Sequence, residues 1–190
     1  MRNMLFTFLL GFCLLAAANS KPKDVPYEDD PQHFNEQKFS TMKQMEGQYF
    51  VKKWSYTNTS FRCHSARRLD ETGGTEDGDV KYELKARNST NNYVSYKTKI
   101  SPRTTNGHTE SNAAKYKISR FDKRRTWKIM TANLTEECLV LVTTFENKTK
   151  ACQLLISKKK AESQIRTPCE DVYDKNCKEK SYQLYQIGCE

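Results

Sequence analysis

The chain has little of what enzymes use. Only three histidines occur among its 190 residues, His33, His64 and His108, and none lies in a Ser/His/Asp or Glu-x-x-His context. The sequence also contains no glycine-rich loop that would hold a phosphate, and no C-x-x-C pair. These absences argue against an enzyme, and we expect neither a cofactor nor a bound metal.

Linkers and internal repeats are also missing. No Pro/Gly/Ser-rich segment divides the chain, so one compact domain is the expected organisation. Residues 21–33 are polar, acidic and proline-bearing, which predicts a flexible leader. The folded domain is therefore expected to span residues 34–190.

Long apolar runs are limited to the first residues. Arg2 precedes an apolar run from Met4 to Ala18, and small residues allow a cut after Ser20. The run is shorter than the roughly 20 residues that a membrane span needs, and no second run is a candidate. We therefore predict a signal peptide over residues 1–20, secretion of the remaining chain, and no membrane association.

Cysteines and sequons agree with export. Removal of Cys13 with the signal peptide leaves an even number of cysteines in an oxidising compartment, which favours three disulfides over a metal site. These cysteines permit 15 pairings, and the sequence alone does not choose among them. Glycosylation is predicted at the Asn-x-Ser/Thr sequons of Asn58, Asn88, Asn133 and Asn147.

Positive charge is in excess. The formal net charge is +9, and it becomes +8 when Arg2 leaves with the signal peptide. This excess favours anionic partners or surfaces. Lys115 and Lys117 flank Tyr116, but strand alternation places the lysines in water and the tyrosine in the core. Without a basic surface that also stacks bases, nucleic acid is not an expected partner.

The apolar pattern changes period near Gly47. Phe34, Phe39, Met42 and Met45 have helical spacing, which predicts a short amphipathic helix that ends at this glycine. A period of two follows. Strands are predicted at 48–56, 61–69, 79–88, 92–100, 114–120, 126–131, 138–145, 151–156 and 181–187. Such regular short strands, with helices before the first and the last, favour an antiparallel barrel with covered ends.

The entry to the first strand, Gly47-Gln48-Tyr49 after a short helix, resembles that of a lipocalin. The chain resembles more specifically the tick salivary lipocalins of the histamine-binding group. Their signature is Cys-Asp-(Val/Ile/Leu), a gap, Glu-Leu-(Trp/Tyr), another gap and Cys. Here the frame is Cys138-Leu-Val, twelve residues, Gln153-Leu-Leu, thirteen residues and Cys169.

This resemblance implies an all-β fold, an eight-stranded antiparallel lipocalin-type barrel with a short N-terminal helix and a late C-terminal helix. It implies a secreted protein that sequesters a small host mediator in its cavity. It also implies disulfides from Cys63 to Cys189 and from Cys138 to Cys169, which leaves Cys152 for Cys177.

Both acidic residues of the family signature are replaced in this chain. Leu139 and Gln153 stand at their positions, and Leu155 replaces the aromatic residue. A buried ammonium needs a carboxylate partner, so we expect weak or no binding of biogenic amines. An apolar acid such as a leukotriene or fatty acid is favoured instead, with its carboxylate at a Lys or Arg of the mouth. Glu83 is another acid to consider, but its parity places it outside.

Strand alternation predicts which side chains point into the barrel. We expect about half of these side chains to fill the barrel base rather than to contact a ligand. In the first strand either Tyr49, Val51 and Lys53 or Phe50 and Trp54 face inward, and Arg120 is a candidate cavity cation or a strand-end arginine in solvent. The ligand-binding candidates are Tyr49, Val51, Tyr82, Leu84, Tyr96, Tyr116, Ile118, Arg120, Trp127, Ile129, Leu139, Leu141, Gln153 and Leu155.

Two other functions are compatible with the same features. The protein is alternatively a binding module that inhibits a host complement, coagulation or immune protein through its outer surface. It is otherwise a secreted shell without a ligand.

Overall fold

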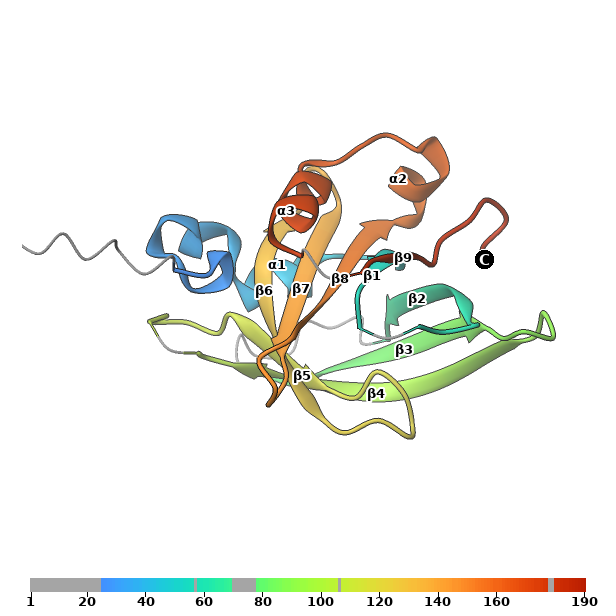
Figure 1. Ribbon diagram of the computed structural model, residues 1–190, viewed down its shortest axis with the longest axis horizontal. Coiled ribbons are helices and arrows are strands. Elements are labelled where there is room, and N and C mark those ends of the chain that lie inside the picture. The colour runs from blue at the N-terminus through green and yellow to red at the C-terminus, as the bar shows by residue number, and fades with distance from the viewer. Residues whose placement is uncertain (1–24, 57, 70–77, 106, 178–179) are drawn as a thin grey trace, which may run out of the picture.

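The computed structural model describes residues 25–56, 58–69, 78–105, 107–177 and 180–190, and the predicted signal peptide lies outside them. Its strands form an antiparallel barrel in which neighbours in sequence are neighbours in the sheet (Figure 1). The strands are β1 (Gln48–Trp54), β2 (Arg62–Arg68), β3 (Val80–Arg87), β4 (Tyr93–Arg103), β5 (Ala113–Tyr116), β6 (Arg125–Asn133), β7 (Cys138–Thr144) and β8 (Lys150–Ser157). Because β1 pairs with both β2 and β8, the barrel closes, which confirms the predicted eight-stranded fold.

The N-terminal segment is folded against the barrel. Two 3-10 helices, η1 (Tyr27–Asp29) and η2 (Pro31–Glu36), precede the helix α1 (Phe39–Gln44) beside β6 (Figure 1). The sequence predicted a flexible leader over residues 21–33 and one helix from Phe34. Residues 21–24 lie outside the described part of the chain, and from residue 25 on the structure differs in both respects. The reason is electrostatic, because Glu28 pairs with Lys150 at 2.8 Å and Asp29 pairs with Lys128 at 2.5 Å.

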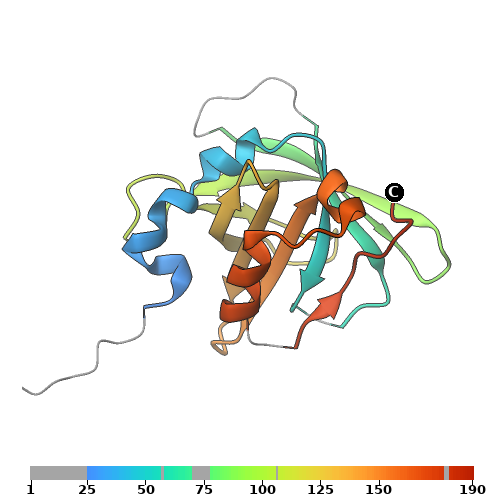
Figure 2. The ribbon, with the colours of Figure 1, turned by 90° about the horizontal axis from the view of Figure 1, so that it is seen from above.

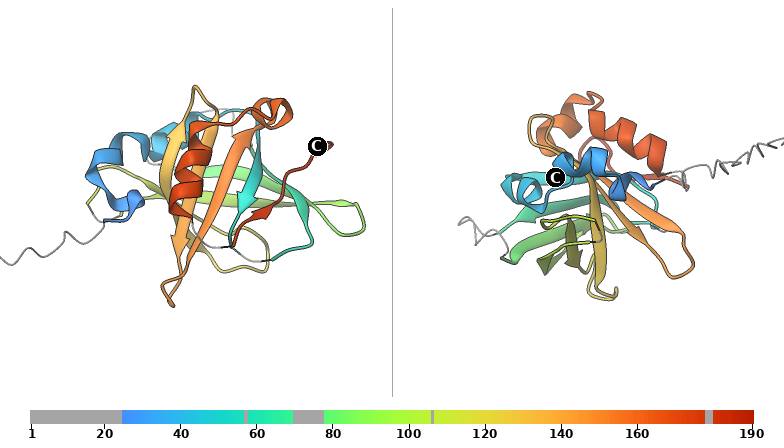
Figure 3. Two further views of the ribbon diagram at one scale, coloured as in Figure 1. Left: turned by 45° about the horizontal axis from the view of Figure 1, so that its top comes forward. Right: turned by 90° about the vertical axis from the view of Figure 1, so that its left-hand side faces the viewer.

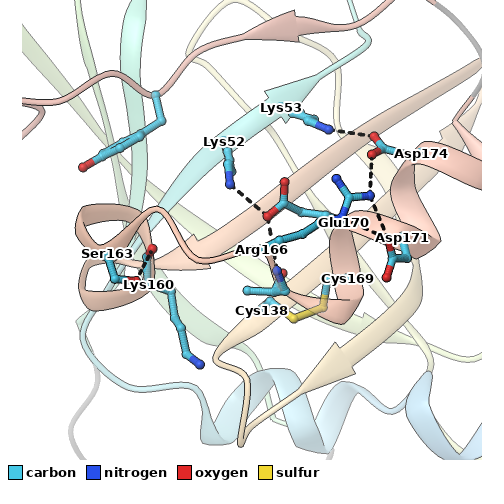
Figure 4. Close-up of polar contacts among 12 residues, drawn as sticks. Lys52, Lys53, Cys138, Lys160, Ser163, Arg166, Cys169, Glu170, Asp171 and Asp174 are labelled. Carbon is cyan, nitrogen blue, oxygen red and sulfur yellow. Dashed lines mark hydrogen bonds and ion pairs between the residues drawn. A yellow bond between two sulfur atoms is a disulfide. The ribbon is translucent and has the colours of Figure 1, made fainter.

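A bulge in β1 changes which side chains face inward. The pairing with β8 shifts by one residue between Val51 and Lys53, so that Lys52 and Lys53 both reach outward. They bind Glu170 at 2.8 Å and Asp174 at 2.7 Å (Figure 4). The residue that follows the bulge therefore faces the interior.

Two late helices cover the outside of the barrel. They are α2 (Lys158–Ser163) and α3 (Pro168–Asn176), and α3 contacts β6, β7 and β8 (Figures 2 and 3). The backbone N–H of Thr167 donates to Glu170 Oε1 at 3.3 Å, which occupies an otherwise free donor at the start of α3. Among the described residues, no helix combines the length and apolarity that crossing a membrane requires.

The short strand β9 (Tyr182–Gln183) shares an edge of β1 with β2. Residues 48–50 of β1 pair with β2, whereas Lys53 and Trp54 pair with β9. A strand was predicted over 181–187, but the chain leaves the ladder early. Beyond it, the Leu184 carbonyl accepts from the Cys63 N–H at 2.9 Å and Tyr185 packs on Phe50, with ring centroids 5.1 Å apart.

Strand β5 is also shorter than predicted. It ends at Tyr116 instead of residue 120. The Arg124 side chain donates to the carbonyls of Lys99 at 3.1 Å and Lys115 at 3.3 Å, and to Ser101 Oγ at 2.8 Å. The Arg124 side chain thus binds where β4 and β5 would otherwise continue to pair.

The barrel wall separates two apolar clusters. The inner cluster fills the barrel, and the outer cluster lies under α3 and the C-terminal segment. All six half-cystines belong to the outer cluster. They form the pairs that the resemblance implies, Cys63–Cys189, Cys138–Cys169 and Cys152–Cys177.

Candidate ligand-binding cavity

The barrel encloses a cavity of about 790 Å³, within the range of small-molecule sites. Its wall is built from the inward-facing positions of the strands. Strand alternation predicted most of these residues. The predicted residues that line it are Tyr49, Val51, Tyr82, Leu84, Tyr96, Tyr116, Ile118, Arg120, Leu139, Leu141, Gln153 and Leu155. The Tyr49 and Val51 alternative is therefore the one found in the first half of β1.

Two predicted residues do not line the cavity. Trp127 and Ile129 face the barrel interior but are fully buried in the inner cluster. The Trp127 ring lies 6.1 Å from that of Tyr116 and 6.2 Å from that of Tyr56, and both tyrosines line the cavity. Parity gives the direction of a side chain but not its depth, so it could not separate these fillers from the wall.

Several wall residues were missed by the sequence reasoning. Met42 belongs to α1 and Met45 follows its last residue, and the apolar spacing of this segment was a signal that could have nominated both. Trp54 faces inward in place of Lys53 because of the β1 bulge, which the sequence does not announce. His64 belongs to β2, for which no inward set was predicted.

The mouth of the cavity carries exposed apolar groups and cations. Phe121 is 99% exposed and Val94 is 46% exposed, and both line the opening. Arg120 also lines it, from an exposed turn after β5. The strand-parity reason for Arg120 was wrong, since β5 ends before it, yet the side chain is at the mouth.

Among the described residues, Asp122 is the one acidic residue that lines the cavity. Its carboxylate already has partners within the protein. Its carboxylate accepts from the Tyr56 hydroxyl at 3.2 Å and lies 3.6 Å from the Arg125 guanidinium. Arg125 also lies 4.8 Å from the Phe145 ring centroid. This cluster joins three loops, so Asp122 is not available to neutralise an ammonium deep in the barrel.

Neutral polar groups occupy the interior. Burial raises the pKa of Tyr49 and of Tyr82 to about 12, and burial also raises the pKa of Tyr116. These hydroxyls are therefore protonated at neutral pH. Gln153 is 4% exposed, and its side chain hydrogen-bonds the Tyr116 hydroxyl, which offsets part of the rise in the pKa of Tyr116.

His64 is a second buried polar group of the wall. Burial lowers its pKa to about 4, so the imidazole is neutral at physiological pH. Its ring centroid lies 5.3 Å from that of Trp54, and Nε2 has no hydrogen-bond partner. Glu83, by contrast, lies outside the barrel and binds Arg67 at 3.0 Å.

The four sequon asparagines lie in loops or at the end of a strand. Asn58 and Asn147 are exposed, whereas Asn88 and Asn133 are half-buried. Asn58 also lines the cavity mouth. Glycosylation at these positions stays a prediction.

Comparisons with known proteins agree with this geometry. The family described as "Tick histamine binding protein" matches residues 27–190. Japanin from Rhipicephalus appendiculatus, solved bound to cholesterol, is similar in structure with a TM-score of 0.53 and 16% identity, over 75% of this chain and 94% of japanin. Apocrustacyanin C2 has a TM-score of 0.55 and 7% identity, over 85% and 87% of the two chains. No protein of curated function matches the sequence significantly.

Proposed function

The chain belongs to the tick histamine-binding protein family, and from this premise we propose that it is a secreted salivary protein that sequesters an apolar or amphipathic host mediator in its barrel. The family and the lipocalin fold are those of ligand-binding proteins rather than enzymes. The mediator that we favour is a lipid acid such as a leukotriene or fatty acid. Evasion of host defence would follow from its removal.

The chemistry of three wall positions carries this proposal. Leu139, Gln153 and Leu155 all line the cavity, at the positions where the family signature has two acids and an aromatic residue. An ammonium transferred into this interior would lose several kcal/mol of hydration without a carboxylate to offset the loss. The cavity is therefore a poor site for histamine and a suitable one for an apolar chain.

The mouth supports an anionic end group. Arg120 lines the opening, and the net charge without the predicted signal peptide is +8. A ligand carboxylate at the mouth stays partly hydrated while it accepts a charge-assisted hydrogen bond from such a cation. The proposed ligand thus lies with its tail among the aromatic and aliphatic wall residues and its acid at the rim.

Calorimetry tests the ligand class. We expect leukotriene B4 or arachidonate to bind with submicromolar affinity, and histamine and serotonin to bind weakly or not at all. Submicromolar amine binding without a response to the lipid acids would overturn the proposal.

A paired variant tests the reason for this preference. Leu139→Asp combined with Gln153→Glu restores both acids of the signature, and we expect it to gain histamine binding and to lose affinity for the lipid acids. Leu139→Asn is the matched control, because it adds polarity at the same position without charge. If both variants gained histamine equally, the missing carboxylates would not be the cause.

A second candidate function is inhibition of a host protein through the outer surface. Lys81 and Lys99 lie directly opposite each other across β3 and β4, and Lys99 also binds Asp79 at 2.5 Å. Lys97 lies on the same outward face, opposite Glu83, and these three lysines outnumber the two acids beside them, so the surface fits an acidic partner. Protein capture that continues after the cavity is filled with lipid would support this candidate, and capture lost on filling would reject it.

A further inference from the structure

Exposed apolar side chains gather at the mouth of the cavity. Phe121, Val94 and Phe61 are 99%, 46% and 36% exposed, and all three line the opening. They belong to the β5–β6 loop (residues 117–124), the start of β4 and the segment before β2. Large apolar groups that remain in water at one place mark a surface that binds a partner. The mouth is therefore a candidate docking surface as well as an entrance.

Contacts with the barrel hold the β5–β6 loop on the C-terminal side of Phe121. The Asp122 carboxylate accepts from the Tyr56 hydroxyl at 3.2 Å and from the Lys123 backbone N–H at 2.8 Å. The Arg124 side chain donates to Ser101 Oγ at 2.8 Å. Asp122 and Arg124 thus bind back onto the barrel, whereas the Phe121 ring stays in solvent. The ring is presented by a loop whose next residues are fixed.

Positive charge surrounds the exposed ring. The β5–β6 loop has a single acid, Asp122, and its cations are Lys117, Arg120, Lys123 and Arg124. Arg120 and Lys123 are exposed and flank Phe121 closely in the sequence, whereas Asp122 is half-buried with partners of its own. The net charge of the loop is therefore positive, and two of its exposed cations lie near the ring.

An aromatic ring between exposed cations suits the interface of an anionic membrane. The ring can enter the boundary between headgroups and acyl chains while the cations stay with the lipid phosphates. Each Lys or Arg near a negatively charged leaflet adds to the binding. A sulfated polysaccharide would also bind the cations, but it would leave the ring in water. The exposed ring therefore favours a lipid surface over an anionic polymer.

We propose that the β5–β6 loop docks the protein on an anionic membrane surface, with the Phe121 ring among the lipids and with Arg120 and Lys123 at the headgroup phosphates. The loop contains no sequon, so no predicted glycan is attached to it. The sequence predicted no membrane association because no apolar run is long enough to span a bilayer, but a surface contact needs no such run. Docking goes beyond ligand capture, and it places the cavity mouth against the layer in which lipid acids dissolve.

Vesicle binding tests the docking in the absence of any lipid acid. The secreted, glycosylated protein is sedimented with vesicles of phosphatidylcholine, or of phosphatidylcholine and phosphatidylserine in equimolar amounts. We expect about 10-fold stronger binding to the anionic vesicles, an effect that high salt weakens. Equal binding to the two compositions, or no binding to either, would overturn the inference. Calorimetry with arachidonate and no vesicles tests the proposed function separately, because a failure there leaves the vesicle result unaffected.

Variants of the loop sharpen the test. Phe121→Ser should weaken binding to the anionic vesicles about 10-fold and leave the fold intact, since the ring is 99% exposed. Ile187→Ser is the matched control, because it removes an apolar side chain that is 77% exposed in the C-terminal segment, and it should behave as wild type. Lys123→Ser should reduce the preference for phosphatidylserine. Vesicle binding that Lys123→Ser weakens but Phe121→Ser does not would reject insertion and assign the cations to an anionic polymer or an acidic protein.

Discussion

The inner and outer faces of the same strands are built differently. On β8, the neighbours Leu154 and Leu155 point to opposite sides of the barrel wall. Leu154 is fully buried in the outer cluster with the three disulfides, whereas Leu155 lines a cavity of about 790 Å³. The outer face is closely packed and covalently tied, and the inner face keeps open space and unpaired polar atoms. Stability and ligand recognition are therefore assigned to opposite faces of one sheet.

The largest predicted effect concerns the covalent ties of the outer face. The disulfide Cys63–Cys189 closes a segment of 126 residues, so its removal by Cys63→Ala with Cys189→Ala should cost on the order of 5 kcal/mol in the free energy of unfolding. Urea denaturation measures this loss. Removal of Cys152–Cys177, which spans 25 residues, should cost about 3.5 kcal/mol. If the folded variants lost lipid affinity in proportion to stability, the separation of the two faces would fail.

Adjacent leucines provide the second test. Leu154→Ala leaves a void in a packed cluster and should reduce the free energy of unfolding by about 4 kcal/mol. Leu155→Ala only enlarges an existing cavity, so we expect a loss of about 2 kcal/mol together with a change in ligand affinity. Denaturation and calorimetry on both variants would show this contrast. Equal stability losses would mean that the inner wall is as closely packed as the outer one.

Acid should destabilise the inner face through His64. Its pKa is about 4 in the folded chain against a usual value of 6.5, so the unfolded chain binds this proton more readily. The stability due to neutral His64 is complete above pH 6.5, and about 3 kcal/mol is lost as the pH falls from 6.5 to 4. We expect His64→Phe to remove this part of the pH dependence in urea denaturation. An unchanged difference between pH 7 and pH 4.5 would contradict burial of a neutral imidazole.

The smallest effect is expected at the solvent side of the outer face. Arg166 bridges Asp171 at 2.7 Å and Asp174 at 3.0 Å, but its side chain is 57% exposed (Figure 4). Arg166→Ala should therefore leave the free energy of unfolding almost unchanged. A chemical denaturation curve at low and at high salt would show this. A larger loss would show that α3 depends on surface charge as well as on the packing beneath it.

The sequence predicted the direction of side chains where strands run without interruption. Tyr82 and Leu84 on β3, and Gln153 and Leu155 on β8, line the cavity as alternation requires. A strand with one buried face fixes its register, because a slip of one residue would turn every apolar side chain into water.

Alternation could not predict local departures from the regular ladder. The bulge beside Lys52 brings Trp54 inward, and the Arg124 contacts coincide with the end of β5 before the predicted boundary. Both depend on long-range contacts that have no local pattern. Alternation also does not predict how deep in the barrel a side chain lies. Trp127 points inward like the wall residues, but it is fully buried.

The placement of all six half-cystines on one side of the wall has a consequence for how the protein can change over generations. Substitutions at Leu139, Gln153 or Leu155 alter the chemistry of the cavity without touching the bridges that hold the strands together. Substitutions at these positions can therefore change the ligand preference while the disulfide-bonded scaffold stays the same. Only a few inward side chains would need to change for the cavity to take a different small molecule.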